Sequence, residues 1–339
     1  MFSIERGSAA WRAVVAVGVV VALVLVTSPA FFLDPIPARL FTKFVALAVV
    51  LLGLQFVVGV SGQLSLCHGV FAAVGSYTAA ITNTSWGWPL WIGLALSPVT
   101  SFVAGSLVGV LALRIRATYL GPVTLGVAVA FPMLLKRFSW LTGGAGGLPL
   151  LREMTPPGSL ALHEWNHVVS VAVAFVAFVL MRNLQQSAIG LSVRAVASNA
   201  FSASTSGVDV RWTRVRAFGT GAAFGGLGGA LLVIDTPIVG ADSYDLFRSL
   251  GYYAAAVVGG VGSMLGAVLG GLLLIGVPWV LDTLGSRVGP NLVFGALLVI
   301  SVALSPGGLA VAAQRGMRAV LAVRERIPGR PAKSGDGPT

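Results

Sequence analysis

Long apolar runs separated by short polar turns make up most of the chain. Several runs carry no charge and are close to the ~20 residues that a helix needs to cross the hydrocarbon core of a bilayer. The pattern therefore predicts an all-α, polytopic integral membrane protein with about ten transmembrane helices, or about eight if its glycine-rich turns are re-entrant. The expected spans are 13–33, 41–60, 66–81, a fourth that ends at 113, 119–135, 168–181, 215–234, the two halves of 250–281, and 292–304.

Glycine interrupts two of these apolar regions. The region 250–281 is too long for one untilted helix, and the glycines between 259 and 262 are expected to divide it in two. A second glycine-rich break extends over 59–75. Because broken membrane helices mark substrate paths in transporters, the segments 59–75 and 259–271 are both candidates for such a path.

Glycine also recurs at every fourth position inside two of the expected spans. Small residues at this spacing let helix backbones approach closely in a membrane, so close helix packing is the simplest role for them. The positions are Gly221, Gly225 and Gly229 in one span, and Gly262, Gly266 and Gly270 in the other.

One long polar interruption, 182–216, carries five arginines between two apolar spans. Within it a set of apolar residues recurs with helical periodicity, which predicts a short amphipathic helix: Val193, Val196, Ala197, Ala200 and Phe201. Ser192 is the expected N-cap of this helix, and Gly207 its left-handed terminator. Such a helix either rests on lipid headgroups or docks onto a soluble partner.

The composition agrees with the membrane assignment. Of the 339 residues, 56% are hydrophobic and 10% are charged, whereas a soluble domain carries about 25% charged residues. The net charge of +11 lies in short loops and in the C-terminal tail, with no basic groove lined by aromatic residues. We therefore expect the lipid bilayer and no nucleic acid among the partners of this chain.

Basic residues also set the expected orientation, because short cytoplasmic loops are enriched in lysine and arginine. Both termini are expected in the cytoplasm, with residues 1–12 as an N-terminal segment and 306–339 as a basic, mobile tail. The membrane-spanning domain is expected over 13–305. Within it, 182–216 is placed in the cytoplasm and 136–167 forms an outer loop.

One enzyme signature is absent from the sequence and another is present. No lysine follows a phosphate-binding GxxxxG pattern, so the chain is not expected to hydrolyse ATP by itself. His163, Glu164 and His167 form a literal HExxH, which on a helix places two imidazoles one turn apart for zinc; Asp235 or Glu153 would supply a third ligand. An intramembrane zinc metalloprotease is therefore an alternative function. The polar start of a helix at the membrane interface is the preferred interpretation, with no bound metal.

Polar residues inside the first glycine-rich break need partners, because an unsatisfied polar group in lipid costs several kcal/mol. They either bond to neighbouring helices or face a water-filled path. Together with positions in two other segments, they form the set of candidate path residues: Gln63, Ser65, His68, Tyr119, Thr124, Gly260 and Gly262.

Several stretches in order resemble one family. The segments are GQLSLCHGVFAAVGSYTAA, ATYLGPVTLGVA, SWLTGGAGGLPL, GLSVRAVASNAFSASTSGVDVRWTRVRAF and GGVGSMLGAVLGGLLL, and they cover most of 58–281. Together they are similar to signatures of the branched-chain amino acid ABC transporter permeases, most closely to the second, larger permease of the system. The chain departs from the family pattern where Ser198, Asn199 and Ser204 replace charged residues and where Cys67 replaces glycine.

The resemblance implies a transport subunit of an ABC importer for branched-chain amino acids or similar small polar solutes, and not an enzyme. It implies a second homologous permease, two cytoplasmic ATPase subunits that bind the ATP, and an extracytoplasmic binding protein. It also implies a bacterial cell membrane location, with no cofactor on this chain. The loop 182–216 would then couple to the ATPase through Arg194, Val196, Ala197, Ala200, Phe201 and Gly207.

Overall fold

The computed structural model describes residues 28, 35–113, 119–151, 154–236, 238–285, 289, 292, 293, 295, 296, 299, 300 and 308–310. The expected N-terminal segment 1–12 lies outside these residues, as does the expected span 13–33 apart from residue 28. The expected span 292–304 and the tail 306–339 are described only at isolated positions.

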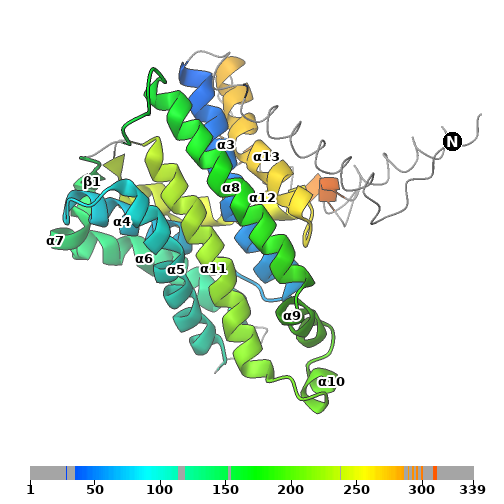
Figure 1. Cartoon of the computed structure of the whole chain (residues 1–339). Helices are drawn as coiled ribbons and strands as arrows, with labels where there is room; N and C mark the ends of the chain where they lie inside the picture. Colours follow the sequence, from blue (N-terminus) through cyan, green and yellow to red (C-terminus); the bar gives the residue numbers. More distant parts are fainter. Residues whose placement is uncertain are drawn as a thin grey trace, which may run out of the picture.

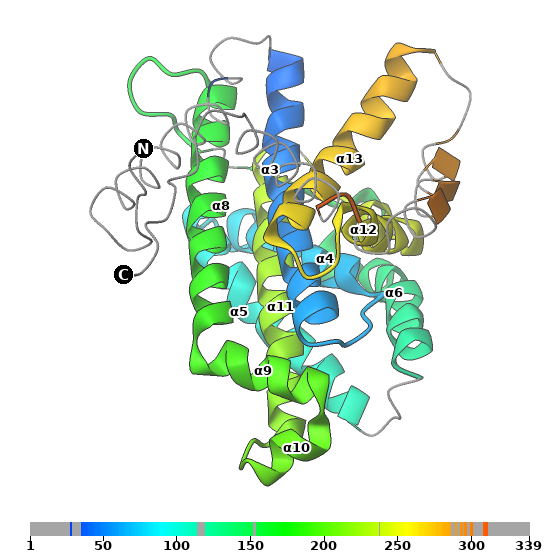
Figure 2. The same ribbon diagram turned by 90° about the vertical axis from the view of Figure 1, so that its right-hand side faces the viewer.

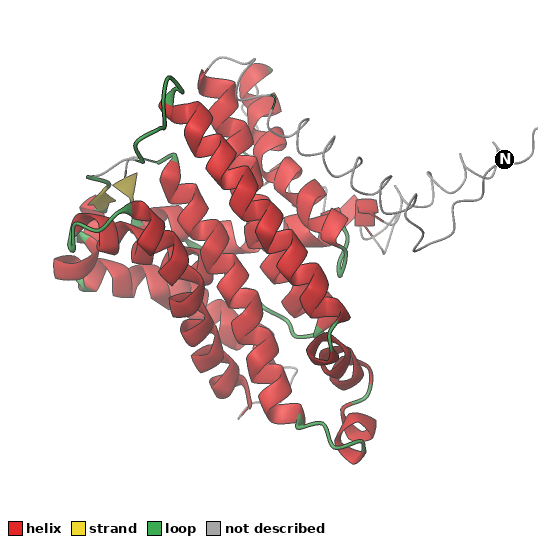
Figure 3. Cartoon of the chain, viewed as in Figure 1, coloured by secondary structure: helices red, strands yellow, loops and turns green. Residues whose placement is uncertain are grey.

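Helices account for nearly all of the described chain (Figure 3). The elements in chain order are α3 (Pro35–Gln55), the π-helix η1 (Phe56–Val60), α4 (His68–Thr84), α5 (Leu90–Leu113), α6 (Leu120–Arg137), α7 (Ser139–Thr142), the 3-10 turn η3 (Gly144–Gly146), β1 (Leu148–Pro149), α8 (Leu162–Gln186), α9 (Ala188–Ser198), α10 (Ala200–Thr205), α11 (Val210–Ile234), β2 (Ile238–Val239), the 3-10 turn η4 (Ala241–Tyr244), α12 (Leu246–Gly259) and α13 (Met264–Thr283). The strands β1 and β2 pair in antiparallel fashion, with Leu148 opposite Val239.

Six helices of the described chain are long and apolar enough to cross a membrane: α3 with η1, α5, α6, α8, α11 and α13. This confirms the prediction of an all-α, polytopic membrane protein. The expected division of 250–281 is also confirmed, because α12 ends at Gly259 and α13 begins at Met264. Helices α4 and α12 are shorter, at 17 and 14 residues.

Helix α11 forms the centre of the bundle and packs against α3, α4 and α5 (Figure 1). Asp209 caps its start, where Oδ1 accepts hydrogen bonds from the backbone N–H groups of Arg211 and Trp212 at 3.0 and 3.1 Å. In the window that defines α11 as a span, 72% of the residues are buried, against 28% in the corresponding window of α6. Helix α6 therefore presents most of its apolar surface to the surroundings of the chain.

The repeated glycines of α11 and α13 lie where other backbones pass closely. A Cβ atom on Gly229 would overlap the carbonyl of Ala72 in α4, and one on Gly266 would overlap the carbonyl of Gly260. A Cβ on Gly270 would lie 2.6 Å from the carbonyl oxygen of Ala255. These helices approach to a distance that only glycine permits.

The start of α8 differs from the sequence prediction. The expected span began at 168, but α8 begins at Leu162 and continues to Gln186. Glu164 Oε2 accepts a hydrogen bond from the backbone N–H of Ala161 at 2.9 Å, which stabilises the first turn in a polar stretch that hydropathy alone does not mark. The pentad 163–167 therefore lies within the helix.

Candidate functional site

The two glycine-rich breaks singled out by the sequence meet in the structure. Gly59, in η1, lies directly against Gly262, and a Cβ atom on Gly59 would overlap the backbone N and Cα of Gly262. Gly262 has a φ of 78° and Gly260 a φ of 116°, a region of backbone conformation that favours glycine. The segments 59–75 and 259–271 are thus the two sides of one contact.

Gln55 holds these two breaks together. Its side chain is buried at the end of α3, where Nε2 donates to the carbonyl oxygen of Ala256 at 2.8 Å and Oε1 accepts from the backbone N–H of Gly262 at 2.7 Å. It stands directly before the π-helix, a type of segment that is frequent at functional sites. Gln55 was not predicted as a site residue, and its one signal in the sequence is that it is a polar residue inside an apolar run.

The polar residues assigned to the candidate path bond to protein groups. Gln63 Nε2 donates to Ser61 Oγ at 3.0 Å and to the carbonyl oxygen of Arg214 at 3.1 Å. The Oγ1 atom of Thr124 accepts from the backbone N–H of Leu66 at 3.1 Å, which ties the start of α6 to the segment before α4. Each of these bonds joins parts of the chain that are distant in sequence or fixes a turn between them.

His68 and Ser65 are fully buried, whereas Tyr119 is 58% exposed. His68 Nε2 lies 3.1 Å from the carbonyl oxygen of Val50, and its ring fills the space beside Gly225 of α11. The seven candidate path residues do not form one cluster, because Gly260 and Gly262 lie beside Gln55 and Gln63 lies elsewhere.

Gln63 lines a recess of about 560 Å³, which we call the α9 recess. Its walls come from residues 61–64, the end of α5, the start of α6, helix α9 and the start of α11. A Cβ atom on Gly62 would lie 3.6 Å from the Cβ atom of Ala197 in α9, an ordinary van der Waals contact. Helix α9 therefore lies next to the segment that carries the polar path residues, with room for a methyl group between Gly62 and Ala197.

The amphipathic helix predicted around Val193 to Phe201 is two helices, α9 and α10, so the prediction of one continuous helix is wrong. Asn199 ends α9 and begins α10, because its Oδ1 accepts from the backbone N–H groups of Phe201 and Ser202 at 3.0 and 3.1 Å. This side chain competes with the backbone for hydrogen bonds and breaks a pattern that continues through it. Ser187, and not Ser192, caps the start of α9.

The predicted coupling residues consequently face different ways. Val196 is buried against the bundle, Ala200 is half-buried, and Phe201 is 77% exposed. Arg194 Nη2 donates to the carbonyl oxygen of Gln185 at 2.6 Å. Gly207 follows α10 with a φ of 83°, in the left-handed region expected for it. The α9–α10 element lies at one end of the bundle, opposite the start of α3 (Figure 2).

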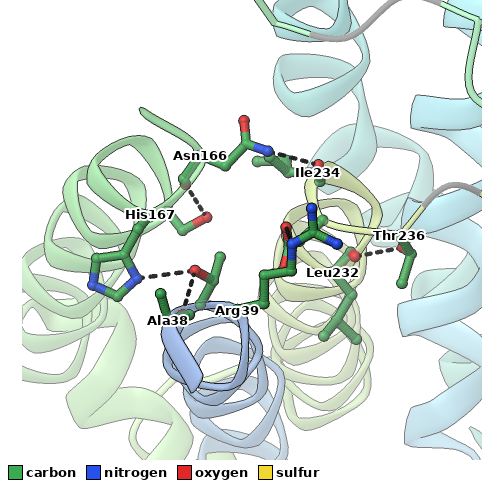
Figure 4. Close-up of polar contacts among 10 residues, drawn as sticks. Ala38, Arg39, Asn166, His167, Leu232, Ile234 and Thr236 are labelled. Atoms are coloured by element: carbon green, nitrogen blue, oxygen red, sulfur yellow. Dashed lines mark hydrogen bonds and ion pairs between the residues drawn. The ribbon is translucent and has the colours of Figure 1, made fainter. Parts of the chain in front are cut away.

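At the end of the bundle where α3 begins, polar contacts join α3, α8 and α11 (Figure 4). Asn166 Nδ2 donates to the carbonyl oxygen of Ile234 at 3.1 Å, and Arg39 Nε lies 3.7 Å from Asp235 Oδ1. Burial raises the pKa of Asp235 to about 6, although nearby positive charges, first among them Arg39, act in the opposite direction. The end of α11 is thus held to both neighbouring helices.

Two of the three HExxH residues have protein partners in the same region. His167 is fully buried, with Nδ1 3.0 Å from Thr42 Oγ1, and Glu164 accepts from the backbone of Ala161. Among the described residues no group of three His, Cys, Asp or Glu side chains is placed to hold a metal ion. Glu153 lies outside the described residues. The described part of the chain gives the metalloprotease alternative no support.

Comparison with known proteins gives a consistent set of matches. A family model described as "Branched-chain amino acid transport system / permease component" matches residues 36–302. The high-affinity branched-chain amino acid transport system permease proteins LivM of Escherichia coli and of Salmonella typhimurium are each 28% identical over 282 residues. These alignments cover 76% of this chain and 66% of the length of each relative. No solved structure matches the chain.

Proposed function

The chain belongs to the branched-chain amino acid transport system permease family, and on this premise we propose that it is the membrane-spanning permease subunit of an ABC importer. Its solutes are branched-chain amino acids or similar small polar molecules. The curated relatives, named as permeases of a high-affinity branched-chain amino acid transport system, support this substrate class.

The observation that carries the proposal is the α9–α10 element. It projects at one end of the bundle and presents Phe201 to solvent, while Val196 and Ala197 of α9 line the α9 recess together with residues 61–64 (Figure 1). A partner that binds Phe201 and moves α9 would therefore move residues 61–64 and the helices joined to them. A membrane subunit that is driven by a soluble ATPase requires such a connection between its docking surface and its membrane helices.

The energy source lies on other chains in this proposal. The sequence has no GxxxxGK[ST] phosphate loop, so two cytoplasmic ATPase subunits bind and hydrolyse the ATP. A second homologous permease completes the translocation path, and an extracytoplasmic binding protein delivers the solute. The chain sits in a bacterial cell membrane, with α9–α10 and both termini on the cytoplasmic side.

Co-purification tests this assignment. The full chain, affinity-purified in mild detergent from its native membrane, is expected to bring down a second permease of the same family and an ATPase with a phosphate loop, both identified by mass spectrometry. Addition of ATP and vanadate is expected to retain the ATPase. A chain that purifies alone, or only with proteins that lack a nucleotide site, would contradict the proposal.

The zinc alternative makes an opposite prediction for Glu164→Gln. A glutamine at 164 can still accept the hydrogen bond from the backbone of Ala161, so folding and solute uptake are expected to match the unchanged protein. Elemental analysis of the purified chain is expected to find no stoichiometric zinc. Stoichiometric zinc that disappears in His167→Ala, together with loss of activity in Glu164→Gln, would favour the protease.

A further inference from the structure

The α9 recess combines positive charge with hydrocarbon. Arg211 and Arg214, in the first two turns of α11, line it, and no aspartate or glutamate of the described chain does. A phosphate group would therefore meet two cations and no competing carboxylate in this lining. Apolar side chains from five parts of the chain line it as well: Leu64, Leu113, Leu120, Val196 and Val210.

Neither arginine forms an ion pair with a described residue. The nearest carboxylate along the chain is Asp209, which is exposed and caps α11 through the backbone N–H groups of Arg211 and Trp212. Arg214 is half-buried and Arg211 is exposed. A half-buried guanidinium without a carboxylate partner attracts an anion more strongly than a fully solvated one does, because the local dielectric constant is lower.

A hydrogen bond joins two walls of the recess. Gln63 Nε2 donates to the carbonyl oxygen of Arg214 at 3.1 Å, which holds the segment 61–64 to α11. The bond uses the backbone of Arg214 and not its guanidinium, so this side chain can turn toward a bound anion. The recess is thus formed before any ligand enters it.

The recess lies at the level where membrane helices leave the hydrocarbon. The end of α5 and the starts of α6 and α11 line it, and all three helices are long and apolar enough to cross a membrane (Figure 2). Aromatic side chains are enriched at membrane–water interfaces. Tyr119, directly before α6, and Trp212, in the first turn of α11, are both exposed. These positions put the recess beside the lipid headgroups.

An apolar helix surface continues from the recess. In α5, the turns that lead away from Leu113 expose Leu107, Val110 and Leu111. In a membrane such a surface borders the acyl chains of the lipids. A molecule with its phosphate at the arginines could therefore lay a hydrocarbon chain along α5 and keep it out of water.

We propose that the α9 recess binds an anionic phospholipid, phosphatidylglycerol, with its phosphate at Arg211 and Arg214 and an acyl chain against the end of α5. Basic pockets between membrane helices are a recognised type of site for anionic lipid headgroups. A zwitterionic lipid fits less well, because its ammonium group would lie beside two cations. The site does not depend on the proposed function, since a lipid binds there whether or not the chain belongs to a transporter.

Native mass spectrometry of the full chain in detergent micelles tests the site. Phosphatidylglycerol or phosphatidylcholine is titrated into the micelles, and the fraction of the chain that retains one lipid gives an apparent Kd. Phosphatidylglycerol is expected to bind about tenfold more tightly, because the arginines repel the ammonium group of phosphatidylcholine. Millimolar glycerol 3-phosphate, which has a phosphate and no acyl chain, is expected to leave the lipid bound. Equal retention of the two lipids, or displacement by glycerol 3-phosphate, would overturn the proposal.

Arginine variants locate the phosphate. Arg214→Gln is expected to raise the apparent Kd for phosphatidylglycerol about tenfold, as for the loss of one charge-assisted hydrogen bond. Arg211→Gln should act in the same direction, and its exposed side chain can be removed without disturbing the bundle. Arg216→Gln is the matched control, because Arg216 is exposed on the same helix and does not line the recess. Equal weakening by the variants at 214 and 216 would show attraction to surface charge alone and would contradict the site.

Ala197→Phe tests the space instead of the charge. Ala197 is exposed on α9 and lines the recess, so the substitution keeps every arginine and fills part of the volume with a ring. It is expected to raise the apparent Kd for phosphatidylglycerol about tenfold, with an unchanged size-exclusion profile. Unchanged lipid binding in Ala197→Phe would place the lipid outside the recess and refute the proposal.

Discussion

Gly59→Ala is expected to abolish the correctly folded protein or to leave only a small fraction of it. The added methyl group would overlap the backbone N and Cα of Gly262, and neither atom can rotate away as a side chain does. Overpacking a well-packed core costs about 1–3 kcal/mol and occasionally more, and a backbone-to-backbone clash belongs at the upper end of that range. The displacement would also pull on the hydrogen bonds of Gln55, which join the same two segments.

The matched control for this substitution is Gly126→Ala in α6. A Cβ atom at Gly126 would meet no other atom within 4 Å, so alanine there should be neutral or should stabilise the helix by about 0.5–1 kcal/mol. Fluorescence-detected size exclusion in detergent measures the folded, monodisperse fraction of each variant. Equal yields and equal thermal unfolding for the two variants would show that the contact between the two breaks does not hold the fold together.

Phe201→Asp is expected to leave the fold intact and to reduce ATP-driven uptake by about one hundredfold, as for the loss of an aromatic residue at the centre of a protein interface. Phe201 is 77% exposed on α10, so its removal creates no cavity in the bundle. In the complex, the new carboxylate would have to lose its water in an apolar groove of the ATPase.

Ser206→Asp is the control for charge, because Ser206 is exposed in the turn after α10 and its replacement adds a carboxylate without removing an aromatic ring. Phe201→Trp keeps the aromatic contact and should retain most of the uptake. Transport by Phe201→Asp at the unchanged rate would exclude docking through this residue, and loss of the folded protein would make α10 a structural element.

The sequence predicted those elements of the fold that depend on residues close together in the chain. Length and hydropathy fix the membrane helices, and the glycines between 259 and 262 divide the last apolar region because a turn there needs a positive φ. Gly207 likewise follows α10 in the left-handed conformation expected of it. At these glycines the backbone conformation itself requires this residue type, so the sequence alone reveals the turn.

Interactions between distant parts of the chain could not be predicted in the same way. The contact of Gly59 with Gly262 and the two hydrogen bonds of Gln55 depend on how α3 packs against α12 and α13. The break at Asn199 was missed for a different reason. Hydrophobic periodicity continues through it, and only the side-chain hydrogen bonds of Asn199 separate α9 from α10.

ATP-dependent uptake of radiolabelled L-leucine tests the central proposal most directly. The chain is reconstituted into liposomes with its co-purified permease and ATPase partners, with ATP enclosed in the lumen and loaded binding protein outside. The account predicts accumulation of L-leucine only when ATP, the ATPase and this chain are all present. Proteoliposomes that hydrolyse ATP with every subunit assembled and still take up no amino acid, or that take it up equally well without this chain, would contradict it.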